Sequence, residues 1–172
     1  MARACYLLFA FTVLSAWAGA QNPAAPAPLT AEDKLRLLRA NGTLIDTLVR
    51  DGLTLSKATN PEDRATQCRG AALSLLRAIE DAAKAEDAER VAELTGLYRE
   101  VIRDGLLPTI AEAQVGVTPE SPAGQRLRGL RASTTNDLTG LKAAIPAGKV
   151  ADNPRVKDAL RSLDEITSTL NR

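Results

Sequence analysis

The sequence predicts an all-α fold, an antiparallel bundle of four to five helices that follows a cleaved signal peptide. Long segments carry apolar residues at spacings of three and four, which is the helical period. Asn-Pro and Ser-Pro pairs, which start helices well, stand in front of three of these segments. β-Branched and aromatic residues are sparse and no alternating apolar pattern occurs, so no segment favours a sheet.

Residues 1–20 have the composition of a signal peptide. Arg3 supplies positive charge, an apolar run ends at Trp17, and Ala18-Gly19-Ala20 matches the small-x-small cleavage pattern. The apolar run is too short for a lasting membrane anchor. We therefore expect an exported protein, periplasmic or extracellular, with no stable membrane anchor after cleavage. Its mature chain would have 172 − 20 = 152 residues.

Two further parts follow the signal peptide. Residues 21–29 form an Ala/Pro-rich linker, which is expected to be extended. Residues 30–172 are expected to form a single helical-bundle domain. The helices are predicted at about 30–58, 60–84, 87–104, 121–145 and 153–171, with a short helix at about 107–113.

The helix predicted first begins after Thr30, which resembles the start of a capping box with Asp33. Its apolar residues occupy one half of the helix surface, and this phase continues through Asn41-Gly42. Asn-Gly is also a turn signal, but the unbroken phase favours a single helix. The apolar residues are Leu35, Leu37, Leu38, Leu44, Ile45, Leu48, Val49, Leu53 and Leu55.

The helix predicted second organises the bundle. Asn60 is a suitable cap and Pro61 suits the first helical position, because proline has no N–H to leave unpaired. Small and apolar residues form one stripe along this helix, which lets another helix backbone approach closely. The residues of the stripe are Ala65, Cys68, Ala72, Leu75, Ile79 and Ala82.

The apolar phase fails near residues 84–89, so a third helix is expected to start near Asp87. Asp104-Gly105-Leu106 predicts its end, with Gly105 in the left-handed conformation, and Pro108 can open the short helix. Ser121-Pro122 and Asn153-Pro154 predict the starts of the last two helices. The predicted inward residues of the third helix are Val91, Leu94, Tyr98 and Val101. Those of the helix at about 121–145 are Leu127, Leu130, Thr134, Leu138, Leu141 and Ile145, and those of the last helix are Val156, Leu160, Leu163, Ile166 and Leu170.

The composition argues against several classes of function. Removing Arg3 leaves 21 basic and 21 acidic residues, so the strong basic field that nucleic-acid binding needs is missing. The chain has no His, the commonest general base and transition-metal ligand. Glu86, Glu89, Glu93 and Glu100 are interpreted as a solvated face, with weak Ca²⁺ or Mg²⁺ binding left open. We expect no cofactor, no nucleic-acid partner and no enzyme activity.

Two sets of residues remain as candidates for function. Cys68 would be the one thiol of the mature chain, so no internal disulfide is expected. Arg64 and Arg69 could activate this thiol, whereas its place in the stripe favours a core residue. Arg126, Arg128 and Arg131 form a basic cluster that could face an acidic partner or a lipid surface. Residues 115–172 hold nine basic and six acidic residues, and residues 61–112 hold seven and eleven, so the helices could also offset one another.

Asn41-Gly42-Thr43 is a formal glycosylation acceptor, but helical phase places Asn41 on the apolar side of the first predicted helix. We therefore expect Asn41 to be a buried or interfacial polar residue that could fix the register between helices.

The segment LIDTLVRDGLTLSKATNPEDRATQCRGAALSLLRAIEDAA, together with VIRDGLL, resembles uncharacterised exported all-helical proteins of GC-rich bacteria. The resemblance implies a bacterial periplasmic setting and no known activity. From the residues themselves we expect a non-catalytic protein that binds a protein partner through a helix face, as an envelope adaptor or chaperone-like binder. Two alternatives stay open: a redox or enzymatic role centred on Cys68, and a structural homodimer.

Overall fold

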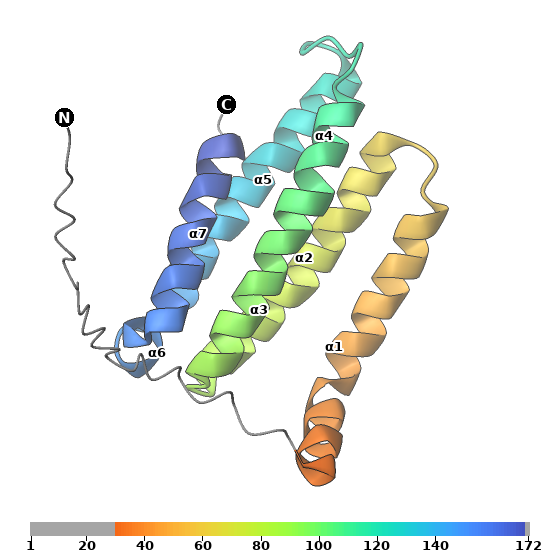
Figure 1. The fold of residues 1–172 in the computed structure, drawn as a ribbon. Coiled ribbons are helices and arrows are strands. Elements are labelled where there is room, and N and C mark those ends of the chain that lie inside the picture. The colour runs from red at the N-terminus through yellow and green to blue at the C-terminus, as the bar shows by residue number, and fades with distance from the viewer. Residues whose placement is uncertain (1–29, 171–172) are drawn as a thin grey trace, which may run out of the picture. The chain divides into compact units, whose positions relative to one another are not determined.

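The computed structural model describes residues 30–170, and this part of the chain forms helices and no strand, which confirms the all-α prediction (Figure 1). The predicted signal peptide and linker lie outside the described residues. The chain divides into two compact units, and the boundary between them in the sequence falls between Leu37 and Leu38, within the first helix. The elements are α1 Ala31–Lys57, α2 Pro61–Lys84, α3 Ala88–Glu100, the π-helical segment η1 Val101–Leu106, α4 Leu107–Ala113, α5 Pro122–Ala144, α6 Lys149–Asp152 and α7 Pro154–Leu170.

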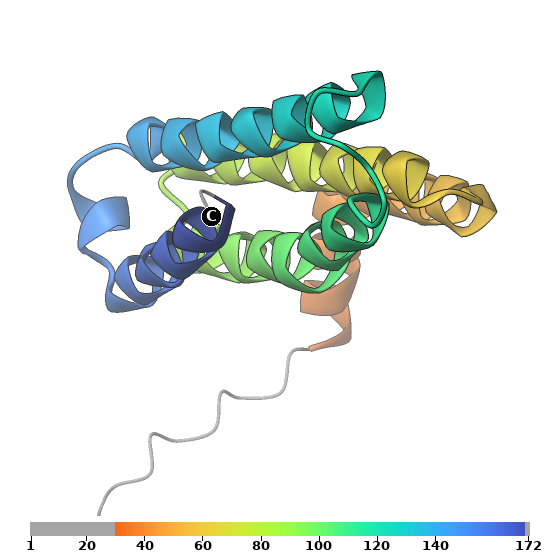
Figure 2. The same ribbon diagram turned by 90° about the horizontal axis from the view of Figure 1, so that it is seen from above.

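The second unit is built around four helical rods that run up and down in turn. Helix α2 packs against α3, η1 and α4 on one side and against α5 on another, while α7 packs against α3 and α5. Figure 2 looks down on these rods and shows α2 beside α5, with α3, α4 and α7 in the other layer. The short α6 packs against α3 and α7. This arrangement is the antiparallel bundle that the sequence predicts.

The helix starts follow the predicted capping chemistry. Asn60 Oδ1 accepts a hydrogen bond from the Asp63 N–H at 2.7 Å, and Ser121 Oγ accepts one from the Gly124 N–H at 3.1 Å. At the start of α7, Asn153 Oδ1 accepts from the Arg155 N–H at 2.9 Å. Each side chain satisfies a backbone donor that the first helical turn leaves without an intrahelical partner. The Asn-Pro and Ser-Pro signals therefore mark the helix boundaries correctly.

The predicted stripe of α2 lies in the core. All six of its residues are buried, and Ala65 and Ile79 have no exposed surface. They pack in one cluster with the inward residues of the other rods, among them Leu94, Tyr98, Leu138 and Leu163. Three predicted inward residues, Val101, Leu130 and Leu160, are half-buried at the edge of this cluster. The apolar periodicity therefore identified the core of the bundle.

The predicted end of the third helix at Gly105 is wrong. Gly105 lies inside η1, which joins α3 to α4 without a break, and the described glycines with positive φ are Gly116 and Gly148. A Cβ atom on Gly105 would lie 3.3 Å from Cys68 Sγ, which is closer than ordinary van der Waals contact. A side chain at this position would crowd Cys68 because α2 and η1 approach closely, and the extra residue of a π-turn keeps the helix continuous.

Replacing Gly105 should show this crowding. Gly96→Ala in α3 meets no atom within 4 Å, so we expect it to stabilise the fold by about 0.5–1 kcal/mol. Gly105→Ala should stabilise less or destabilise, because the methyl group presses on Cys68. Denaturant unfolding of both variants in the wild-type and Cys68→Ala backgrounds measures the difference. Equal effects of Gly105→Ala in the two backgrounds would contradict the contact.

Candidate functional site

Helix α1 is much less buried than the rods beside it. None of its described side chains is buried, whereas every rod contributes several buried residues. In the part of α1 that belongs to the second unit, Leu44, Leu48 and Leu55 are half-buried against the core. Helix α1 runs unbroken through Asn41-Gly42, as predicted. It therefore covers the bundle with only part of its apolar surface.

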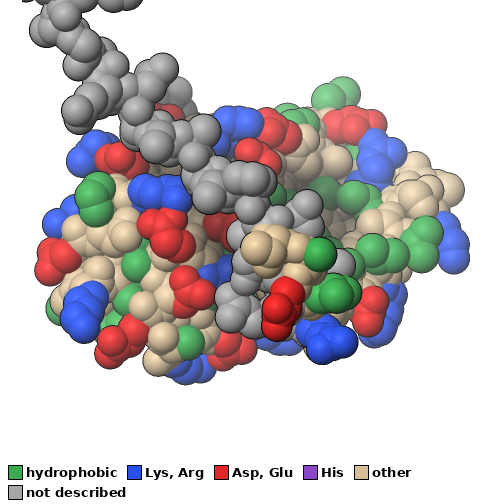
Figure 3. Space-filling model, turned by 60° about the horizontal axis from the view of Figure 1, so that its bottom comes forward, with side chains coloured by type: hydrophobic (Ala, Val, Ile, Leu, Met, Phe, Trp, Pro, Cys, Tyr) green, Lys and Arg blue, Asp and Glu red, His purple; other side chains and the backbone are tan. Residues whose placement is uncertain are grey.

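The uncovered part of α1 is a row of large apolar side chains, here named the α1 stripe: Ile45, Val49 and Leu53. Their exposed fractions are 41, 57 and 59%, and their spacing of four residues places them along one ridge of the helix. Figure 3 shows hydrophobic side chains at the surface on the side where α1 lies. Covering these side chains would contribute roughly 1 kcal/mol each, since full burial of such a side chain contributes about 1.5–3 kcal/mol.

A cavity of about 300 Å³ opens beside the α1 stripe, between α1, α2, α3 and η1. Its wall is mainly apolar, and Leu97 of α3, which is 44% exposed, joins it to the outer surface. Three polar side chains, Asp51, Gln67 and Glu100, complete the lining. The remaining lining residues are Leu48, Gly52, Leu55, Ala71, Leu75 and Val101. Such a cavity can hold apolar side chains and place a cation against its two carboxylates.

Two polar contacts fasten α1 to its neighbours. Asn41 Oδ1 accepts a hydrogen bond from Arg90 of α3, and Asp51 Oδ2 accepts one from Ser74 Oγ of α2 at 3.3 Å. Asn41 is half-buried, so the prediction of an interfacial residue is confirmed. These contacts fix the register of α1 against both helices. They also fix the direction in which the α1 stripe faces.

Cys68 lies in the core, at 4% exposure, as its place in the α2 stripe predicts. Burial raises the pKa of its thiol, and the Thr109 hydroxyl and the charge of Arg64 offset this rise only in part. A raised pKa lowers the fraction of reactive thiolate at neutral pH. The surroundings of Cys68 therefore suit a small core residue better than a nucleophile.

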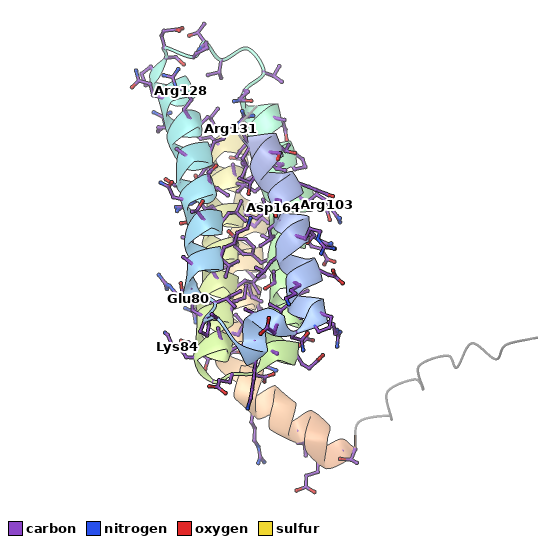
Figure 4. All side chains as sticks on the ribbon, turned by 90° about the vertical axis from the view of Figure 1, so that its left-hand side faces the viewer. Glu80, Lys84, Arg103, Arg128, Arg131 and Asp164 are labelled. Carbon is purple, nitrogen blue, oxygen red and sulfur yellow. The ribbon has the colours of Figure 1, made fainter. Side chains whose placement is uncertain are left out.

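The predicted basic cluster does not act as one group. Arg126 is paired with Glu62 of α2, and Arg131 donates a hydrogen bond to Gln114 Oε1 at 3.0 Å. Arg128 is exposed and has no ion pair with any residue that the structure describes. Figure 4 shows Arg128 and Arg131 near one end of α5. One free cation remains from the three predicted residues within residues 30–170.

The acidic residues of α2 to α4 pair partly with other helices and partly within their own helix. Glu89 pairs with Arg155 of α7, Glu112 pairs with Arg64, and Glu93 pairs with Arg90. The first of these links the acidic half of the chain to its basic half, as does the pair between Glu62 and Arg126. Within the described residues no group of His, Cys, Asp and Glu could hold a metal ion. Figure 3 shows acidic and basic side chains interspersed on the visible surface.

An ion pair lies partly inside the bundle between α2 and α5. Arg69 Nη2 and Nε donate to Asp137 Oδ2 at 2.7 and 3.1 Å, and both side chains are largely covered. The phenol of Tyr98 is buried close to this pair; burial raises its pKa, and the charge of Asp137 raises it further. Tyr98 therefore stays neutral at physiological pH. The pair links α2 to α5.

The sequence did not point to Leu97, Gln67 or Glu100 as surface-site residues. Leu97 lies off the inward seam of α3, and the other two belong to charged or polar faces. The available signal was the width of the apolar half of α1, because a helix at the edge of a bundle cannot bury nine apolar residues spread over half its surface. An apolar arc of that width predicts a second contact surface.

Burial of Cys68 predicts slow labelling of the native protein. In a chain carrying Cys5→Ser, a thiol reagent should react at least about a hundredfold more slowly with the native protein than with the unfolded one. A control chain carrying Cys5→Ser, Cys68→Ala and Ser168→Cys, with its thiol on the exposed face of α7, should react at once. Rapid labelling of native Cys68 would contradict the buried position.

Comparison of the chain with protein-family models, curated proteins and solved structures found no match. Within the described part, no helix has the length and apolar character needed to cross a membrane. The function therefore has to be inferred from the residues of the chain itself.

Proposed function

We propose that this chain is a non-catalytic exported protein of the bacterial envelope that acts by protein–protein interaction, as an adaptor or chaperone-like binder. The observation that supports this most is the apolar face of α1, on which Ile45, Val49 and Leu53 stay exposed beside an apolar cavity. Contiguous apolar surface with polar residues around it is typical of an interaction site.

The shape of this face favours a helix as the bound element. The α1 stripe forms a ridge with a spacing of four residues, and such ridges pack into the grooves of another helix. Leu97 and the cavity lie next to the ridge and can receive the side chains of an amphipathic helix. Asp51 and Glu100 would attract a basic residue at its edge. The partner is thus a protein that presents an amphipathic helix.

Lysine substitutions on the α1 stripe test this proposal. Val49→Lys or Leu53→Lys should reduce capture of a specific partner from envelope extracts, after cross-linking, by at least about tenfold. Val115→Lys is the matched control, because Val115 is 81% exposed and lies in the loop before α5. All three sites are exposed, so stability should change by less than about 0.5 kcal/mol, which thermal unfolding verifies. Capture that is equal for all variants, or absent for the wild type, would contradict the proposal.

Export is the second part of the proposal and rests on residues 1–20. Expression of the whole chain in a bacterium should give a protein that begins near Gln21, as mass spectrometry can show. This protein should lack tryptophan fluorescence, because Trp17 is the one Trp of the chain. A matched chain starting at Met followed by Gln21 should stay in the cytoplasm. Recovery of uncleaved protein that retains Trp17 would contradict the proposed cleavage.

A further inference from the structure

The α1 stripe has an edge that carries one acidic and one basic residue. Asp46 follows Ile45, and Arg50 follows Val49, so both lie along the same side of the stripe. Both are exposed, and neither forms an ion pair with a described residue. The edge therefore offers two charges of opposite sign, one helical turn apart, next to an uncovered apolar ridge.

Given the interaction surface proposed above, we infer that its partner helix is α1 of a second copy of this chain, bound antiparallel about a two-fold axis. A two-fold axis perpendicular to two antiparallel helices brings the same edge of both copies together. Asp46 and Arg50 of one copy would then lie along the same line as Asp46 and Arg50 of the other. Whether opposite charges meet depends on the register.

Packing allows two registers. Side chains of one ridge must fall between those of the other, so the axis has to lie level with residue 48 or with residue 50. With the axis level with residue 48, the stripe residues of the two copies alternate at intervals of about 3 Å, since the helix rises about 1.5 Å per residue. The order along the seam is Leu53 of the copy, Ile45, Val49 of the copy, Val49, Ile45 of the copy and Leu53.

Charge selects between these registers. With the axis level with residue 48, Asp46 lies directly opposite Arg50 of the second copy, and the symmetry repeats the pair. With the axis level with residue 50, the two Arg50 side chains would face each other and repel. The first register is therefore the one that the edge charges favour. Arg39 and Lys57 face each other only at the ends, where the crossing angle has moved the helices apart.

Charge reversal tests this register. In sedimentation equilibrium, over protein concentrations from about 1 µM to about 1 mM, the wild-type chain should pass from monomer to dimer. Asp46→Arg or Arg50→Asp alone should weaken the dimer by at least about tenfold, because each places like charges opposite one another. An equimolar mixture of the two variants should recover dimers of wild-type affinity, since one chain then carries both cations and the other both anions. Arg128→Asp on α5 is the matched control and should leave dimerisation unchanged.

Disulfide trapping tests the direction of pairing. Val49→Cys should form an intermolecular disulfide, because the two copies of residue 49 lie about 3 Å apart along the axis. Ile45→Cys should not, since its two copies lie about 9 Å apart. A parallel pair would trap both variants and overturn the antiparallel register, as would single charge reversals that leave the dimer unchanged.

The outcomes for the dimer and for the proposed function are separable. A wild-type chain that stays monomeric throughout overturns the self-association but leaves the proposed function standing if Val49→Lys still abolishes capture of another protein. A wild-type chain that neither dimerises nor captures another protein overturns both. Dimerisation with no other protein captured supports the self-association and contradicts the proposed adaptor function.

Discussion

The close approach of α2 to the helices around it is the contact on which the rest of the structure depends. The small side chains of Ala65, Cys68 and Ala72 project little from the backbone of α2. Gly105 has no Cβ atom, which at this position would press on Cys68. Helix backbones can then lie close enough for the larger residues above and below to interdigitate. The π-helical segment η1 lies at this contact and joins α3 to α4 in one rod that packs against α2.

The same arrangement explains why α1 differs from the other helices. The stripe of small residues on α2 packs against the rod α3–η1–α4 and against α5. Only the side of α2 next to this stripe is left to contact α1. There α1 is held by leucines and by the polar contacts of Asn41 and Asp51. The core of the bundle is buried although part of the apolar surface of α1 stays exposed. The exposed ridge that results is the basis of both proposals made for this chain.

Charge in this molecule acts mostly between helices. The acidic and basic halves of the sequence meet in pairs such as Glu62 with Arg126 and Glu89 with Arg155. Exposed pairs of this kind contribute little to stability individually, but they favour one pairing of rods over others. Asp46 and Arg50 are among the charged residues that form no ion pair with a described residue, and they are informative because they lie beside the exposed α1 stripe.

The sequence by itself determined the helical class, the helix starts at Asn60, Ser121 and Asn153, and the buried stripes. These features depend on local backbone chemistry and on a periodicity that any packed helix must satisfy. It did not determine the conformation of Gly105, since a helix stop and a close helix contact both call for glycine.

Only the tertiary structure decided which apolar residues of α1 are covered and where the cavity lies. Periodicity shows that a helix has an apolar face, but how much of that face is buried depends on how many neighbours the bundle places against it. Leu48 and Val49 look alike in the sequence. One lines the cavity and the other is more than half exposed, because the packing of α2 and α3 leaves room for only part of α1.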